Sequence, residues 1–333
     1  MKTFIEKMRH CIHDEKGASI IIVSLSMTFI MVVAALVVDI GLAYFKTTHL
    51  ENAVDSAALA AGQLMPVNIN DSEKINLVKI KAVEYAAKNG IANVQTSSVV
   101  LTGVVNGLYT QLSIDIPMQV ETTLARIIGV NTINFSRNSK IKIAPCKKAD
   151  NLVPLSIEKA NMDYYIAHGQ TTHLALKFGG GGGTVGAYGA IDLDGVRGGG
   201  ANDYENWLAN GFTSELSVGE QLYPVETGNM AGPTNQALMY RYGECTHFPE
   251  SGGCVLGQYN INCPRVVKVP VIEYDSKHYV KIRGFAAFII EPISQSGYIY
   301  GSFIKIIASG EPADDVNVGD PLDYGIYAIR LIN

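Results

Sequence analysis

The chain has 333 residues, a length that predicts more than one folded unit. Apolar residues make up 47% and charged residues 17%, below the roughly 25% of an ordinary soluble domain. This composition excludes disorder and a coiled coil as descriptions of the whole chain, because aliphatic residues are plentiful and charge is scarce. The net charge of −5 argues against a broad nucleic-acid-binding surface, so we expect no nucleic acid partner.

An uncharged apolar run occupies residues 18–38. A helix needs about 20 such residues to cross the roughly 30 Å hydrocarbon core of a bilayer, so the run predicts one transmembrane helix. The alternative is a cleaved secretory signal, whose apolar core is shorter, about 7–15 residues. Basic residues are more frequent before the run than just after it: Lys2, Lys7, Arg9 and Lys16 against Lys46. The positive-inside rule therefore predicts a cytoplasmic stub over residues 1–17 and an extracytoplasmic C-terminal bulk at the cell membrane.

The helix is expected to continue beyond the membrane until Pro66, which gives a second segment over residues 18–66. Alanine is dense in its outer half and has the best helix propensity. A stripe of mostly small residues recurs there at helical spacing: Leu50, Val54, Ala57, Ala58 and Ala61. Such a stripe can pack against the chain's own outer part or against neighbouring subunits of an assembly.

Residues 67–145 predict a small α+β unit. A helix capped by Asn70, Asp71 or Ser72 ends at Asn89-Gly90 and is followed by strands at 97–105 and 108–116. Asn106-Gly107 joins these strands and is a strong hairpin signal. A short helix at 121–129 and a strand at 131–143 complete the unit.

Residues 146–333 predict a larger, glycine-rich and β-rich outer domain. Its period-2 runs and its Gly and Pro turns favour antiparallel strands. The expected strands are 172–178, 220–226, 263–274, 279–293, 298–308 and 324–332, and the expected helices are 201–210 and 233–242.

The N-terminal block resembles the TadE/TadG-like family of Flp (tight-adherence) pilus assembly proteins. The segments that carry the resemblance are EKGASIIIVSLSM (15–27) and ALVVDIGLAYFKTTHLENAVDSAALAAG (35–62). The family pattern is met, among other positions, at Gly17, Asp39, Gly41, Asn52 and Asp55. Cleaved prepilins usually carry Glu five positions after the glycine. Ile22 stands there, so we expect the leader to be retained, with cleavage at Gly17 left open.

The resemblance implies an α+β fold in which one transmembrane helix extends into a pilin-like α+β unit, followed by the β-rich outer domain. It also implies a non-enzymatic, minor pilin-like component of Flp pilus assembly that supports adhesion. Its expected partners are the lipid bilayer and other pilus-assembly or pilin-like subunits. The alternatives are a membrane-tethered hydrolase and a binding module that uses tyrosines such as Tyr298 and Tyr300.

Four cysteines lie beyond the span: Cys146, Cys245, Cys254 and Cys263. An even number in an oxidising space predicts two disulfides, and three connectivities remain open. The alternative is a zinc site in which His247 joins the last three cysteines. The absence of a CxxC pair and the irregular spacing favour disulfides, so we expect no metal and no cofactor.

Two further motifs resemble ligand sites. Gly181, Gly183 and Gly186 fit a dinucleotide fingerprint in spacing, but no helix pattern follows, which favours a plain loop. Asp192 and Asp194 resemble part of a calcium loop that lacks its later acidic ligands, so an ordinary turn is the expectation and calcium binding stays open. Catalytic residues are not predicted.

Overall fold

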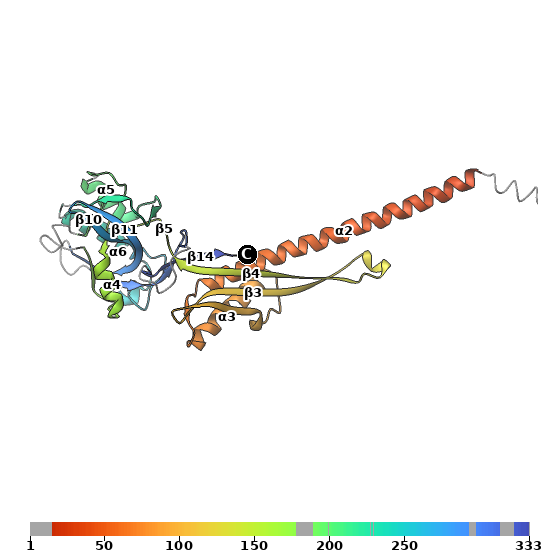
Figure 1. Cartoon of the computed structure of the whole chain (residues 1–333), viewed down its shortest axis with the longest axis horizontal. Coiled ribbons are helices and arrows are strands. Elements are labelled where there is room, and N and C mark those ends of the chain that lie inside the picture. Colours follow the sequence, from red (N-terminus) through yellow and green to blue (C-terminus); the bar gives the residue numbers. More distant parts are fainter. Residues whose placement is uncertain are drawn as a thin grey trace, which may run out of the picture.

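The computed structural model describes residues 15–177, 189–198, 200–226, 228, 230–292, 298–313 and 323–332. Helix α2, Glu15–Gly62, is its longest element, and its N-terminal half projects away from the rest of the chain (Figure 1). The helix is continuous because its apolar part passes directly into an alanine-rich part without glycine pairs or proline. It ends shortly before Pro66, where a proline disfavours helical backbone in the preceding residue.

The outer half of α2 packs on the first of the two six-stranded sheets of the described residues, together with helix α3, Ser72–Lys88. This first sheet contains β1 (Val67–Asn68), β2 (Val99–Val105), β3 (Leu108–Glu121), β4 (Thr132–Pro145), β13 (Ile306–Ile307) and β14 (Ile326–Leu331). Asp71 caps α3 by accepting a hydrogen bond from the Lys74 backbone, as a helix N-cap requires. The two helices and the sheet therefore enclose one hydrophobic core.

The β2–β3 hairpin turns at Asn106 and Gly107, as predicted. Their φ angles are 48° and 75°, and Val105 pairs with Leu108 across the turn. Both residues thus adopt the positive φ that a type I′ hairpin turn demands.

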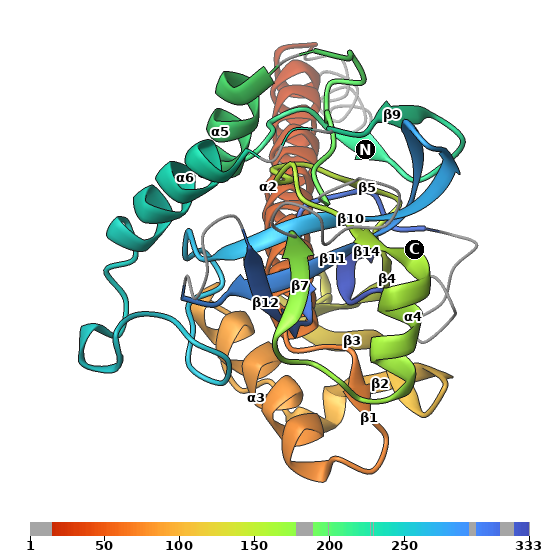
Figure 2. The ribbon, with the colours of Figure 1, turned by 90° about the vertical axis from the view of Figure 1, so that its left-hand side faces the viewer.

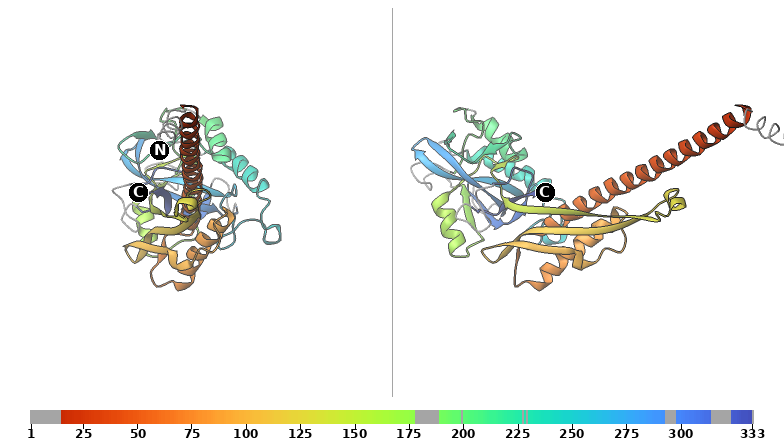
Figure 3. Two further views of the ribbon diagram at one scale, coloured as in Figure 1. Left: turned by 90° about the vertical axis from the view of Figure 1, so that its right-hand side faces the viewer. Right: turned by 45° about the vertical axis from the view of Figure 1, so that its right-hand side comes forward.

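The β3–β4 hairpin is longer than expected and runs alongside α2 toward its apolar part (Figure 3). The predicted helix at 121–129 is wrong. Strand β3 continues through Pro117 to Glu121, and only a 3-10 turn, η2 (Ala125–Ile128), forms at the tip. Pro117 is tolerated because β2 pairs with β3 only as far as Ile114, which leaves that side of β3 as an edge.

The second sheet forms the outer lobe. It contains β6 (Ile157–Glu158), β7 (Leu174–Lys177), β9 (Leu222–Pro224), β10 (Val266–Ser276), β11 (Tyr279–Ile290) and β12 (Ile299–Ile304). The short pair β5 (Lys148–Ala149) and β8 (Leu216–Ser217) lies apart from it. The sheet is antiparallel, as predicted, except that β6 runs parallel to β10.

Helices α4 (Lys159–Ala167), α5 (Gly200–Asn210) and α6 (Ala231–Gly243) contribute to one core of the outer lobe (Figure 2). Helices α5 and α6 were expected, whereas α4 was not. The 3-10 turns η1 (Thr96–Ser98) and η4 (Pro249–Ser251) complete the described elements. Strand β11 contributes alternate residues to two core clusters, because both of its faces are covered.

The C-terminal strand leaves the outer lobe and returns to the first sheet. Strand β14 pairs antiparallel with β4, with Ile329 opposite Ile143. The predicted α+β unit of residues 67–145 therefore also includes β13 and β14, which come much later in the sequence. The predicted outer domain of residues 146–333 accordingly lacks these two strands. The physical reason is that the apolar side chains of β4 are buried and its edge needs a strand partner.

Candidate functional site

The N-terminal half of α2 exposes an apolar surface. The helix is long and apolar enough to cross a membrane. Ile20 is 68% exposed and Phe29 is 70% exposed, which is unusual for large apolar side chains of a folded chain. Hydrocarbon is the environment in which such side chains are stable, so this half of α2 is the candidate membrane anchor.

Asp39 lies where this apolar half ends, and its side chain is buried. Its carboxylate accepts backbone hydrogen bonds from Thr123 (2.8 Å), Leu124 (2.9 Å) and Ala125 (2.5 Å). These donors belong to the tip of the β3–β4 hairpin, at the start of η2, where backbone N–H groups have no partner within the turn. We call this contact the Asp39 clamp. It joins the end of the anchor to a segment more than eighty residues further along the chain.

The hairpin tip brings more apolar surface to the anchor. Leu124, Ala125 and Ile127 line a groove of about 470 Å³ together with α2 residues such as Val32 and Leu36. Ile127 is 79% exposed. The tip therefore lies beside the apolar half of α2, on the N-terminal side of Asp39 along the helix.

The other predicted motif residues are placed differently. A Cβ added at Gly41 would meet no atom of another element within 4 Å, and nothing in the structure explains a glycine there. Asn52 is exposed and Asp55 is half-buried, on the side of α2 away from the core. Gly17 lies in the first turns of α2, and nothing is described of its surroundings.

The small-residue stripe is fully used within the chain. All five of its members are at most 1% exposed and pack in one cluster with α3 and the first sheet: Leu50, Val54, Ala57, Ala58 and Ala61. A neighbouring subunit cannot reach this face in the folded chain. Of the two alternatives left open by the sequence, the structure favours packing on the chain's own outer part.

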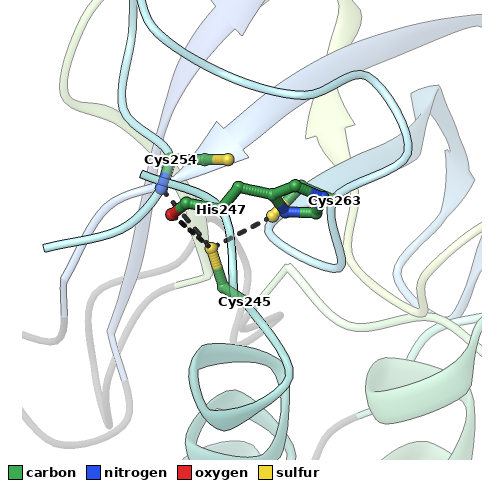
Figure 4. Close-up of side chains that lie close together, drawn as sticks. All are labelled: Cys245, His247, Cys254 and Cys263. Atoms are coloured by element: carbon green, nitrogen blue, oxygen red, sulfur yellow. Dashed lines mark hydrogen bonds between the residues drawn. The ribbon is translucent and has the colours of Figure 1, made fainter. Parts of the chain in front are cut away.

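Three of the four predicted disulfide cysteines gather with a histidine. The ligand atoms of Cys245, His247, Cys254 and Cys263 all lie within 4.8 Å of one another (Figure 4). The Sγ atoms of Cys245 and Cys263 are 3.3 Å apart. We call these four residues the Cys–His cluster.

The cluster perturbs the acidity of its thiols. Burial raises the pKa of Cys245, but the N–H of Cys254 and the thiol of Cys263 donate to its sulfur and bring that pKa down to about 6. Burial raises the pKa of Cys263 to about 12. One thiol of the pair thus loses its proton far more readily than the other.

Cys146 is not a member of the cluster. It is buried where β4 ends, close to the backbone of Gly310, and burial raises the pKa of its thiol to about 12. All four cysteines are free thiols in the structure. The two predicted disulfides therefore stay a prediction.

The two motifs that resemble ligand sites remain without support. Gly181, Gly183 and Gly186 lie outside the described residues. Asp192 is buried, and Asp194 accepts a hydrogen bond from the Val196 backbone, as in an ordinary turn. Burial, followed by the nearby carboxylate of Glu226, raises the pKa of Asp192 to about 6.

An aromatic stack lies at one edge of the second sheet. The ring centroids of His173 and Tyr300 are 4.0 Å apart, and those of Tyr300 and Tyr298 are 6.2 Å apart, with nearly parallel planes. Glu291 holds the His173 ring through a contact of 2.8 Å. The two tyrosines named in the binding-module alternative thus lie in one row with an exposed histidine.

Sequence reasoning found Asp39 as a motif residue but missed what it binds. A hint of this contact was present in the sequence LARIIG, a mostly apolar segment between the polar ends of β3 and β4. Its proximity to residue 39 could not be read from the sequence, because the partners are more than eighty residues apart.

Comparison with known proteins gives one family match, in the N-terminal part of the chain. The Tad family model, which describes TadE/G-like Flp pilus-assembly proteins, matches residues 17–64. The match covers the apolar helix, Asp39 and the small-residue stripe, and it confirms the resemblance read from the sequence. No curated protein and no solved structure matched the chain in these comparisons.

Proposed function

We propose, from the Tad match over residues 17–64, that this chain is a membrane-anchored, minor pilin-like component of Flp pilus assembly. It acts by anchoring and by contact with other subunits rather than by catalysis. The N-terminus lies in the cytoplasm and both lobes lie outside the membrane, in line with the basic residues before the span.

The Asp39 clamp is the observation that carries this proposal. A helix that only tethered the chain would need no contact with the outer fold at the membrane boundary. The clamp instead ties that boundary to the β3–β4 hairpin, so the first sheet takes a fixed direction relative to the membrane. A subunit that must present a surface to neighbours in the same membrane gains from such a fixed direction.

The exposed side of α2 beyond the membrane is the surface that this arrangement presents. Thr48, Asn52, Asp55 and Leu59 follow one another at steps of three or four residues and so share one helix face. The opposite face is filled by the first sheet. We assign the exposed face to contact with another pilus-assembly subunit, because the matched family segment includes it and the fold does not use it.

Replacing Asp55 with lysine tests this assignment. In a strain that lacks the native copy, we expect Asp55→Lys to lower surface pilus output at least fivefold, because a reversed charge opposes the partner's surface. Membrane insertion and the thermal midpoint should be unchanged, since the side chain is half-exposed. Asp115→Lys, an exposed position on β3, is the matched control and should leave output unchanged. Normal pilus output from Asp55→Lys would refute the contact.

The aromatic stack favours a second candidate, a carbohydrate-binding module in the outer lobe. Parallel rings suit the apolar faces of sugar rings, and Tyr298, Tyr300 and His173 form such a row. Adhesion would then follow from this edge of the second sheet. A glycan array probed with the detergent-extracted chain and with its Tyr300→Ala variant distinguishes this candidate, because only the intact stack should retain glycan.

A further inference from the structure

The segment between α6 and β10, residues 244–265, has little regular structure. It contains the 3-10 turn η4 and one isolated bridge between Val255 and Gln258. Loops of this length inside a compact lobe are uncommon, and they need some other source of order. The Cys–His cluster lies within this loop, with one cysteine near each end and one in the middle.

We propose that Cys245, His247, Cys254 and Cys263 bind one zinc ion that orders this loop. Three thiolates and one imidazole are a ligand set of structural zinc sites. The site goes beyond the proposed function, and it contradicts the absence of a metal that we expected from the sequence.

The distances suit a tetrahedral ion. With a Zn–S bond of about 2.3 Å, two sulfurs of a tetrahedron lie about 3.8 Å apart. The Sγ atoms of Cys245 and Cys263 are 3.3 Å apart, and all four ligand atoms lie within 4.8 Å of one another. Shifts of about 1 Å therefore bring the four atoms into coordination distance of one centre.

Each sulfur also accepts a backbone hydrogen bond. The N–H of Cys254 donates to Cys245, the N–H of Asn260 to Cys254, and the N–H of Arg265 to Cys263, each at 3.4 Å. Outer hydrogen bonds of this kind orient metal ligands and stabilise their ionised form. The loop backbone is thus arranged around three sulfurs rather than around a single sulfur pair.

The His247 ring also supports a metal ligand role. Its Nδ1 atom is buried and has no hydrogen-bond partner among the described residues. A buried polar atom without a partner destabilises a fold, unless a ligand supplies the missing interaction. Coordination of zinc through Nδ1 satisfies this atom.

Arg265 and Gly253 complete the surroundings. Gly253 has a φ of 99°, which favours glycine, and its backbone lies beside both the Arg265 guanidinium and the Cys245 sulfur. Three thiolates and a divalent zinc ion carry one net negative charge. The buried Arg265 beside them offsets that charge.

A disulfide explains these observations less completely. It would join two of the three sulfurs by a bond of about 2.05 Å and leave the third sulfur and the His247 ring without a role. Zinc binding uses all four groups, and the three thiols release their protons as the ion enters. The ion then links the end of α6 to the start of β10 across the loop.

Metal analysis of the full-length chain tests the site. The chain is extracted in detergent from its native membrane, purified through a tag that binds no metal, and analysed by plasma mass spectrometry. We expect about one zinc ion per chain, and less than a tenth of that in Cys263→Ser and His247→Asn. Cys146→Ser is the matched control and should retain the full zinc content, because Cys146 is not in the cluster.

Two further measurements keep the result decisive if a variant fails to fold. Cobalt added to the metal-free wild-type chain should produce the intense absorption of a tetrahedral cobalt–thiolate complex. A zinc chelator should lower the thermal midpoint of the wild type and of Cys146→Ser. Two results would overturn the site. One is zinc-free protein with a disulfide between cluster cysteines, seen as a mass lower by two hydrogen atoms. The other is zinc-free protein in which all thiols react with an alkylating reagent.

Discussion

Asp39 shows how one side chain at the end of an apolar helix segment can organise a fold. From the sequence alone, a carboxylate at the end of an apolar run indicates only where a membrane-spanning segment would end. In the structure it accepts three backbone hydrogen bonds from the hairpin tip and is almost completely buried. Hydrogen bonds to an ionised group are worth about 1.5–3 kcal/mol each, so this residue joins anchor and outer fold more firmly than an apolar contact of similar size.

Replacing Asp39 with asparagine should loosen the hairpin tip. The amide keeps one acceptor oxygen and loses the charge, so we expect a loss of about 2 kcal/mol in stability, confined largely to the tip. Hydrogen exchange of the backbone around Thr123–Ala125 measures this in detergent-extracted protein. Asp115→Asn, at an exposed position on β3, is the control and should leave exchange unchanged. Equal protection in Asp39→Asn and the wild type would contradict the clamp.

From the sequence, a zinc site at the Cys–His cluster was the less favoured alternative to two disulfides. Spacing rules for zinc sites come from ligands on short turns, whereas here the ligands are spread over residues 245–263. Folding of the loop, rather than adjacency in sequence, brings them together. A buried histidine nitrogen without a partner is visible only in three dimensions.

Helix α2 works as two elements joined end to end. Its first half meets only the tip of the β3–β4 hairpin among the described residues and exposes apolar side chains, whereas its second half is the central element of a hydrophobic core. The periodicity of the second half predicted a packing face correctly. It did not say whether that face meets the same chain or another, because a stripe of small residues suits both.

Enlarging this face should therefore damage the fold itself. Ala57→Leu or Ala61→Leu adds methylene groups to a closely packed core, which costs about 1–3 kcal/mol. The thermal midpoint should fall by several degrees, and pilus output should fall only in proportion to the folded protein that remains. Ala60→Leu, at a half-buried position of the same helix, should shift the midpoint much less. A selective loss of assembly with an unchanged midpoint would show that the face meets a partner after all.

At the scale of the whole molecule, the two lobes are not independent consecutive domains. The outer lobe is inserted between β4 and β14, and both of these strands belong to the first sheet. Tyr327 of β14 is 1% exposed and lies in the same core cluster as the second half of α2. Strand β14 thus completes the lobe that packs on the second half of α2.

Removing the Tyr327 ring should destabilise the lobe that packs on α2, although the residue lies far from most of that lobe's other strands in the sequence. Truncation of a buried aromatic side chain costs about 3–5 kcal/mol, so Tyr327→Ala should abolish exchange protection in β3 and β4 before it affects β10 and β11. Tyr240→Ala, at a side chain that is 50% exposed, is the control and should change neither. Protection lost first in β10 and β11 would contradict this topology.

The sequence by itself determined the features that depend on local pattern. These are the apolar helix, its alanine-rich continuation, the Asn106-Gly107 hairpin, most strands of the outer lobe and the Tad resemblance. Tertiary structure decided the partner of Asp39, the return of β14 to β4, the burial of the small-residue stripe and the gathering of the cysteines with His247. The physical reason is that helix and hairpin preferences act over a few residues. The other contacts join segments that are far apart in the sequence and that meet only in the folded chain.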